Sequence, residues 1–402
     1  MSIHTTLGNL ALTIRALLFC LTALSLSLNV QSVDGAEPAR PGALAEDRPS
    51  EEFRFRDDKG RERVVQGTVR ITAQDGGLLV LGRDGTLCTI EPAQLIARQT
   101  GTGKFSPLAP AELGKEILKE RGAGFQVLTT KHYVLCFNTS REYAQWCGAL
   151  FERLFAGFYN FWKQRGIELH EPEFPLVALI FADEKQYAAY SSRDVGPEEA
   201  APYGYYFSGS NRVVLYDQTA SGGKPARSLA EIQRRFAASP ANIATVVHEA
   251  THQIAFNSGL HTRYADNPLW LTEGMAMYFE APDLQGRTGW KTIGAVNSSR
   301  LKPFRASLAR RPAGSLVALI QSDALFTTQE SQGAAYAEAW ALTYFLIRTR
   351  KDAYVTYLKK IAAKPVLTWD QPAQRLADFR EAFGDDLPKL EGDFLRYFRN
   401  LP

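Results

Sequence analysis

The feature that most constrains this chain is the motif H-E-A-T-H at residues 248–252. In a helix, residues four apart lie on the same face, so the imidazoles of His248 and His252 can converge on one metal ion. The side chain of Glu249 then lies beside that ion. H-E-x-x-H on a helix therefore predicts a zinc site with two histidine ligands. The alternative is a buried histidine pair on an apolar helix face.

The surrounding sequence predicts the two helices that would carry such a site. Ser239 followed by proline predicts a helix over 240–257, because serine caps a helix start and proline is tolerated at the first position. The Asn-Pro pair at 267–268 predicts the start of a second helix, which carries Glu273. Two histidines and a glutamate leave one position open for water, as in catalytic zinc sites. We therefore expect one Zn²⁺ per chain, held by these three side chains.

The second predicted helix carries a more specific signature. Its sequence P-L-W-L-T-E-G-M-A-M-Y-F-E, residues 268–280, resembles the second-helix signature of gluzincin metallopeptidases, and most of all that of the peptidase-MA-like secreted proteins of unknown function. The resemblance covers residues 125–402 and implies that Glu273 is the third zinc ligand. It also implies an α+β fold in which a mixed α/β lobe precedes an α-helical lobe.

These residues predict hydrolysis of an amide. Zn²⁺ lowers the pKa of a water and polarises a carbonyl, while Glu249 is expected to accept the water's proton and deliver it to the leaving amine. The oxyanion needs a further donor. In gluzincins this is often a tyrosine or histidine well downstream of the third ligand, and Tyr336 lies sixty-three residues after Glu273. Tyr336 also fits the apolar face of its own helix, so core packing is the alternative.

Two more positions near the motif are open to interpretation. Ligand imidazoles usually donate their second N–H to a carboxylate or a carbonyl. Some gluzincins place an acidic residue four positions after the ligand glutamate, but this chain has Met277 there. Glu280 or a backbone carbonyl could take that role. His261 is expected to be a residue of the loop between the two helices, with a substrate contact as the alternative.

The first 36 residues predict export. A weakly basic start ends at Arg15, the apolar run over 16–28 is too short to span a bilayer comfortably, and small residues near 33–36 offer a cleavage site. The protein would then be periplasmic, extracellular or at the cell surface, with no stable membrane insertion. An uncleaved segment that tethers the chain to a membrane is the alternative. Residues 37–52, rich in Pro, Ala and charge, predict a linker.

Composition excludes one class of partner and limits the disulfides. The net charge is +3 with both signs mixed along the chain, and no Lys/Arg run is dense enough to predict nucleic-acid binding. Removal of a signal peptide would leave Cys88, Cys136 and Cys147, an odd number that cannot form a closed set of disulfides. Cys136 and Cys147 could pair, or all three could be buried thiols.

Residues 53–100 predict a small β domain in front of the metal domain. Four short strands separated by Asp-Gly and Gly-Gly turns indicate a small β-barrel, with a weak resemblance to the SH3-like modules found beside catalytic domains of exported bacterial proteins. No catalytic residue is expected in it. Residues 101–124 predict a connector with one short helix over 111–120.

Residues 125–402 are expected to form the metal domain. Its first half is predicted to contain a strand over 125–137, a helix over 141–165, a strand over 176–181, a helix over 184–190, a hairpin of strands over 203–207 and 212–216, and a loop over 219–227. The resemblance implies that the hairpin supplies an edge strand for substrate backbone, with an ordinary interior hairpin as the alternative. After residue 280 the chain is predicted to be mostly helical, including stretches over 334–350 and 378–399.

Together these features predict an exported zinc metallopeptidase that acts on a peptide or protein substrate. An endopeptidase is favoured over an aminopeptidase, because no G-x-M-E-N-type motif and no carboxylate cluster precede the zinc helix. Two other functions share the same residues. One is a zinc-binding scaffold or adhesion protein without catalysis, and the other is a zinc amidase that acts on a non-peptide cell-wall component. The oligomeric state is left open.

Overall fold

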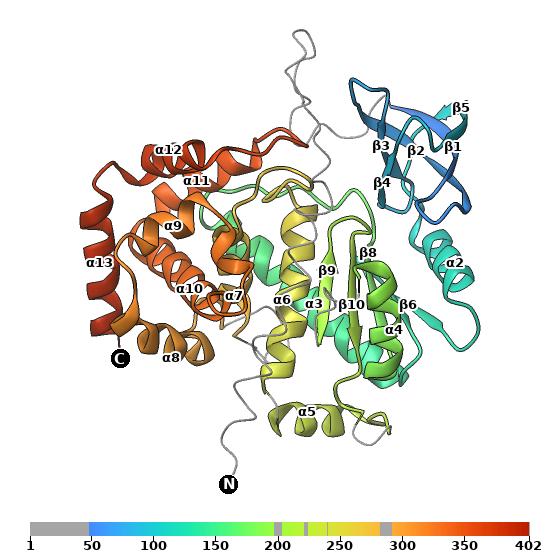
Figure 1. Ribbon diagram of the computed structural model, residues 1–402. Helices are drawn as coiled ribbons and strands as arrows, with labels where there is room; N and C mark the ends of the chain where they lie inside the picture. The colour runs from blue at the N-terminus through green and yellow to red at the C-terminus, as the bar shows by residue number, and fades with distance from the viewer. Residues whose placement is uncertain (1–47, 197–202, 221–223, 239, 282–291, 402) are drawn as a thin grey trace.

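The computed structural model describes residues 48–196, 203–220, 224–238, 240–281 and 292–401 (Figure 1). The predicted signal segment, most of the predicted linker, the capping residue Ser239 and part of the predicted 219–227 loop lie outside these residues. Within them the chain has the predicted α+β organisation, in which an antiparallel sheet and a mixed sheet with helices precede a helical region.

The N-terminal sheet has five strands, one more than the turn signals predicted. They are β1 (Pro49–Arg56), β2 (Glu62–Thr72), β3 (Leu78–Gly82), β4 (Leu87–Ile90) and β5 (Leu95–Lys104), in the order β4-β3-β2-β1-β5. Phe53 and Val80 form part of its small core. The missed strand β5 is mostly exposed and so lacks an apolar alternation. The first strand also begins within the segment predicted as a linker.

The prediction of a closed barrel was wrong. Strands β4 and β5 are the two edges of the N-terminal sheet and do not pair with each other. Strand β5 is hydrogen-bonded along β1. At the β4 edge, the Leu87 N–H donates to the Gly209 carbonyl of the second sheet at 2.8 Å, so one backbone group of this edge strand finds its partner outside the N-terminal sheet.

The second sheet also has five strands, in the order β6-β7-β8-β10-β9. They are β6 (Gln126–Thr129), β7 (Tyr133–Phe137), β8 (Leu176–Phe181), β9 (Gly204–Phe207) and β10 (Arg212–Tyr216). Strands β7, β8 and β10 are parallel, while β6 and β9 are antiparallel edges. The predicted strand over 125–137 is in fact the hairpin β6–β7. Glu152 holds its turn, accepting from the Thr130 hydroxyl and the His132 N–H.

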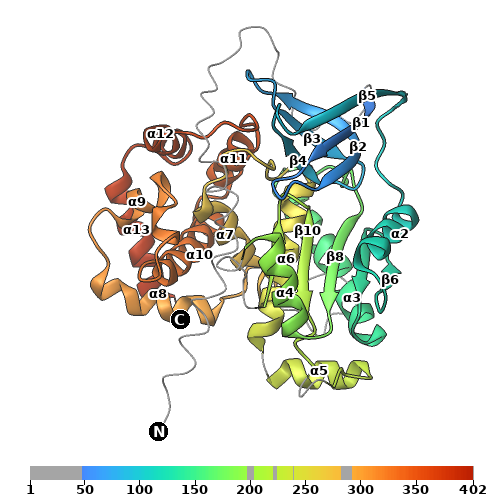
Figure 2. The same ribbon diagram turned by 45° about the vertical axis from the view of Figure 1, so that its right-hand side comes forward.

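Helices cover both faces of this second sheet (Figures 1 and 2). They are α2 (Pro110–Arg121) and α4 (Glu184–Asp194) on one face, and α3 (Arg141–Lys163) and α6 (Pro240–Asn257) on the other, with α5 (Leu229–Ala238) before α6. Cys136 packs among the residues of the first face and Cys147 among those of the second. The two thiols therefore do not pair, and Cys88, Cys136 and Cys147 are all free.

The chain after α6 is helical, as predicted. Its elements are α7 (Leu269–Phe279), α8 (Ser298–Ser307), the short 3₁₀ turns η3 (Leu308–Arg310) and η4 (Ala324–Phe326), α9 (Ser315–Gln321), α10 (Gln332–Thr349), α11 (Lys351–Ala362), α12 (Pro372–Phe383) and α13 (Leu387–Asn400). The predicted stretch over 378–399 is divided at Gly384, whose φ of 92° ends α12. No helix in the described ranges is both long and apolar enough to cross a bilayer.

Candidate metal centre

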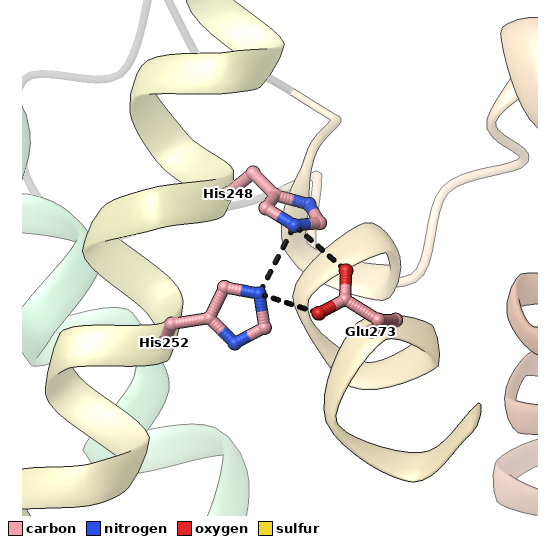
Figure 3. A group of neighbouring side chains, drawn as sticks. All are labelled: His248, His252 and Glu273. Atoms are coloured by element: carbon pink, nitrogen blue, oxygen red, sulfur yellow. Dashed lines mark hydrogen bonds and ion pairs between the residues drawn. The ribbon is translucent and has the colours of Figure 1, made fainter. Parts of the chain in front are cut away.

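Three side chains from two helices meet where the mixed sheet adjoins the helical region (Figure 3). His248 and His252 come from α6, and their Nε2 atoms lie 3.0 Å apart. Glu273 comes from α7, with Oε2 at 3.1 Å from His248 Nε2 and Oε1 at 3.3 Å from His252 Nε2. The structure therefore brings together the three residues that the sequence predicted as metal ligands, all of them buried.

The helix that carries Glu273 is fixed by close packing. Every residue of α7 is buried. Gly274 lets α7 approach α10, because a Cβ at this position would lie 2.2 Å from Thr343 Oγ1 and 2.5 Å from the Ala339 carbonyl. This absence of a side chain beside Glu273 is what allows the two helices to touch.

The start of α7 differs from the prediction of an Asn267 cap. Asn267 donates its amide to the Thr262 and Ala265 carbonyls instead. The first free N–H of the helix, on Leu269, donates to Asp323 Oδ1 at 2.9 Å, and Asp323 is itself paired with Arg375 at 2.9 Å. The cap thus comes from a residue far along the chain, which local sequence patterns do not reveal.

The second ring nitrogen of His248 has a carboxylate partner. Nδ1 lies 2.9 Å from Glu280 Oε1, so Glu280 occupies the role left open by Met277. Glu280 also accepts from Asn297 at 2.7 Å and from two nitrogens of Arg300 at 2.7 and 3.2 Å. Burial alone would raise the pKa of Glu280, but the Arg300 charge and the His248 contact lower it to about 2. The Glu280 carboxylate at Nδ1 therefore orients the His248 ring, whose Nε2 lies 3.1 Å from Glu273 Oε2.

The candidate general base is also held in place. Glu249 is 2% exposed, and its Oε2 accepts the Tyr206 backbone N–H at 2.8 Å. Tyr206 belongs to β9, so the free edge of the second sheet faces the metal helix. Burial raises the pKa of Glu249, against the opposing effect of His248 and His252. A carboxylate with a raised pKa is suited to take up and release a proton near neutral pH.

Tyr336 lies in the interior of α10 and is buried. Its ring is 3% exposed and packs edge-on against Phe326 at 5.0 Å, as a core residue would. Its hydroxyl is buried and has no hydrogen-bond partner among the described residues. Burial, followed by the negative charge of Glu273, raises the pKa of the Tyr336 phenol well above its usual value.

His261 lies in the loop between α6 and α7, as predicted, but it is buried. Its side chain is 1% exposed, its ring is tilted against that of Phe256 at 5.3 Å, and neither ring nitrogen has a partner among the described residues. Burial lowers the pKa of His261 to about 3, so the imidazole is neutral. The geometry assigns it no contact with the three candidate ligands.

The donor set fits a divalent metal ion. Two imidazole nitrogens 3.0 Å apart repel through their lone pairs unless a proton or a cation lies between them. Glu273 Oε1 is buried, has no hydrogen-bond partner among the described residues and lies 3.3 Å from His252 Nε2, so it has a lone pair that a metal ion could use. The carboxylates of Glu273 and Glu280 outweigh burial and raise the pKa of His248 to about 10, which also favours a positive charge here. His248, His252 and Glu273 could therefore hold a metal ion, with all candidate ligand atoms within 4.8 Å of one another.

Sequence reasoning missed most of the residues that support the ligands. Asn297 and Arg300 at the start of α8, Asp323 and Tyr206 come from three separate segments, and their contacts with the site depend on tertiary structure. Only Glu280 left a signal, because it follows the ligand helix and carries a charge in an otherwise apolar run.

A family model matches the part of the chain that holds the candidate site. The model of that family, described as "Protein of unknown function (DUF1570)", matches residues 242–368. The matched part contains the candidate ligands, Glu249, Glu280 and Tyr336, and therefore runs from α6 to just beyond α11. No curated protein matches the chain.

Proposed function

We propose that the protein is an exported zinc-dependent metallopeptidase, and that an endopeptidase is favoured. The observation that carries this proposal is the convergence of His248, His252 and Glu273, with the carboxylate of Glu249 one residue from the first ligand. Two histidines and one glutamate are a ligand set typical of catalytic zinc, which keeps an open coordination position. A purely structural zinc site would not need Glu249.

The chain's own residues divide the work of hydrolysis. A bound Zn²⁺ would polarise the substrate carbonyl and lower the pKa of the attacking water. Glu249 Oε2 is held by the Tyr206 N–H, so we assign proton transfer to Oε1. That oxygen accepts the proton of the attacking water and then delivers it to the leaving amine. Glu280 fixes His248 so that its Nε2 lone pair faces the metal.

We assign the oxyanion contact to Tyr336. Its hydroxyl has no partner among the described residues, although it is close enough to Glu273 for that charge to affect its pKa. A phenol with no internal hydrogen bond can donate to a developing oxyanion without first breaking a contact. This assignment uses the same position in α10 that also packs against Phe326.

The substrate peptide is proposed to add to the edge of β9. This strand pairs with β10 on one side only, and its Tyr206 N–H already contacts Glu249. An extended peptide at a sheet edge obtains its register from main-chain hydrogen bonds and needs no free terminus. That mode of binding favours cleavage within a chain.

The test is a map of new peptide termini. The zinc-loaded protein without residues 1–36 and its Glu249→Gln variant are incubated with a denatured protein mixture, and zinc content is measured for both. New internal termini with the wild type alone support an endopeptidase. No new termini from a zinc-containing wild type would contradict the peptidase and leave a non-peptide amide or a scaffold role. The mature N-terminus of the exported protein tests the proposed signal peptide.

A further inference from the structure

The N-terminal sheet is hydrogen-bonded directly to the second sheet, at the turn between β9 and β10. The Leu87 N–H of β4 donates to the Gly209 carbonyl at 2.8 Å. Arg263, from the loop between α6 and α7, donates Nη1 to the Gly85 carbonyl at 2.8 Å. Its Nε donates to the Ser208 carbonyl at 2.7 Å and its Nη2 to Ser208 and Gly209. One guanidinium therefore binds carbonyls of both sheets at once.

Packing reinforces this contact between the sheets. Phe174, which leads into β8, packs edge-on against Phe105 at 6.3 Å, and both rings are buried with Leu81. Beside them, Arg48 pairs with Glu173 at 3.1 Å. An apolar cluster with an ion pair at its side is an interface that resists separation, unlike a flexible tether.

The same turn is fastened to the metal helix. The Asn211 carbonyl accepts from Gln253 at 2.9 Å, and its side chain exchanges hydrogen bonds with Asn257 at 2.7 and 2.8 Å. The Tyr206 hydroxyl donates to Asn211 Oδ1 at 2.8 Å. The backbone N–H of that same tyrosine donates to Glu249 at 2.8 Å. The turn and the carboxylate of Glu249 are therefore connected through one residue of β9.

We infer that the N-terminal sheet is a positioning element of the metal site, and that Arg263 is the positioning residue through which it acts. With Arg263 in place, the turn from Ser208 to Asn211 has a fixed position between the two sheets. Strand β9 then presents the Tyr206 N–H to Glu249 in one geometry. The role given to Glu249 rests on the proposed function, but the mechanical link from Arg263 to β9 does not.

This inference gives the N-terminal sheet a role distinct from recruitment or blocking. A recruiting module would need no contact with the β9–β10 turn. A blocking module would be released without harm to the site. In contrast, loss of the contacts made by Leu87 and Arg263 should loosen β9 while the metal ligands on α6 and α7 keep their places, because neither residue contacts a ligand.

The test is hydrogen exchange measured by mass spectrometry on the full-length folded protein. Arg263→Ala should raise exchange about tenfold in peptides that cover 83–90 and 204–216, since both lose their shared donor. Leu87→Pro removes a single outward-facing N–H from an edge strand and should raise exchange over 204–216 in the same sense. Metal affinity should be unchanged in both variants, whereas kcat should fall with little change in KM.

Arg61→Ala is the matched control. Arg61 is exposed in the turn between β1 and β2 and pairs with Asp57 at 2.7 Å, away from the β9–β10 turn. It should leave exchange over 204–216 unchanged. Unchanged exchange there in both Arg263→Ala and Leu87→Pro overturns the inference, and a uniform rise across the whole chain would indicate general destabilisation and overturn it equally. Hydrogen exchange does not require catalytic activity. The exchange result therefore tests the inference even if the protein proves not to be a peptidase.

Discussion

Glu280 Oε1 lies 2.9 Å from His248 Nδ1, although the two residues are 32 positions apart in the chain. The Glu280 carboxylate also accepts hydrogen bonds from Asn297 and Arg300. Four donor atoms from three side chains therefore converge on it. Its charge is thus fully compensated inside the protein. This arrangement fixes the orientation of the His248 ring before any metal binds.

Glu280→Gln should weaken metal binding by about 10- to 100-fold, because the amide is a poorer acceptor for His248 Nδ1–H and leaves Arg300 with no charged partner. Competition with a chromophoric chelator measures the change. Glu338→Gln is the control, since Glu338 is likewise buried and paired with an arginine, Arg311, at 2.7 Å but lies outside the site. Equal losses in the two variants would contradict a role for Glu280 in orienting His248.

Stability of the metal-free protein should fall as pH rises above neutrality. The contacts with Glu273 and Glu280 raise the pKa of His248 to about 10. The unfolded value is about 6.5, so the folded state binds the extra proton between the two values. The stabilisation is complete below about pH 6.5 and is lost as pH rises through about 10.

Urea unfolding of chelator-treated protein at several pH values measures this effect. The urea concentration at the unfolding midpoint should decline between about pH 7 and pH 10. The decline should be much smaller in His248→Gln. Zinc should reverse the trend, because the metal competes with the proton for His248 Nε2 and binds more tightly as pH rises. A midpoint of the metal-free protein that stays flat over this range contradicts the prediction.

Gly274→Ala should destabilise the protein by about 1–3 kcal/mol, because the new methyl would be forced against α10. Its Cβ would lie 2.2 Å from Thr343 Oγ1, and the other close atom is a backbone carbonyl that cannot turn away. Gly333→Ala is a sharp control, since Gly333 is in α10 itself and has no atom within 4 Å of an added Cβ. That change should be neutral or stabilising by up to about 1 kcal/mol. Thermal unfolding of both variants decides the matter.

Helix α6 was predicted with its observed bounds because its signals are local. The proline at its start and the four-residue spacing of His248 and His252 can be interpreted from the geometry of a single helix. The same holds for the buried face of α3. The third ligand followed from a signature within α7. These elements are adjacent in sequence, so the pattern along the chain was enough to place the three ligands together.

What the sequence could not predict depends on contacts between distant segments. The Asp323 cap of α7, the Arg300 partner of Glu280 and the hydrogen bond from Tyr206 to Glu249 have no local pattern. The open N-terminal sheet is a similar case. Alternating strands and tight turns favour a closed barrel, but whether the two edge strands pair depends on tertiary structure. Here β4 and β5 do not pair, and the Leu87 N–H of β4 donates to the Gly209 carbonyl instead.

Tyr336→Phe separates the two interpretations of the tyrosine in α10. The hydroxyl has no hydrogen-bond partner among the described residues, so its removal should leave stability unchanged or slightly raised. Metal affinity should also stay the same, because Tyr336 is not a candidate ligand. If the hydroxyl stabilises the oxyanion, kcat should fall by about 10²-fold. Tyr357→Phe is the control, since that phenol is also buried and without a hydrogen-bond partner in the described part of the chain, but its ring stacks on Trp270. A Tyr336→Phe variant with the wild-type kcat would show that Tyr336 only packs in the core and has no part in the mechanism.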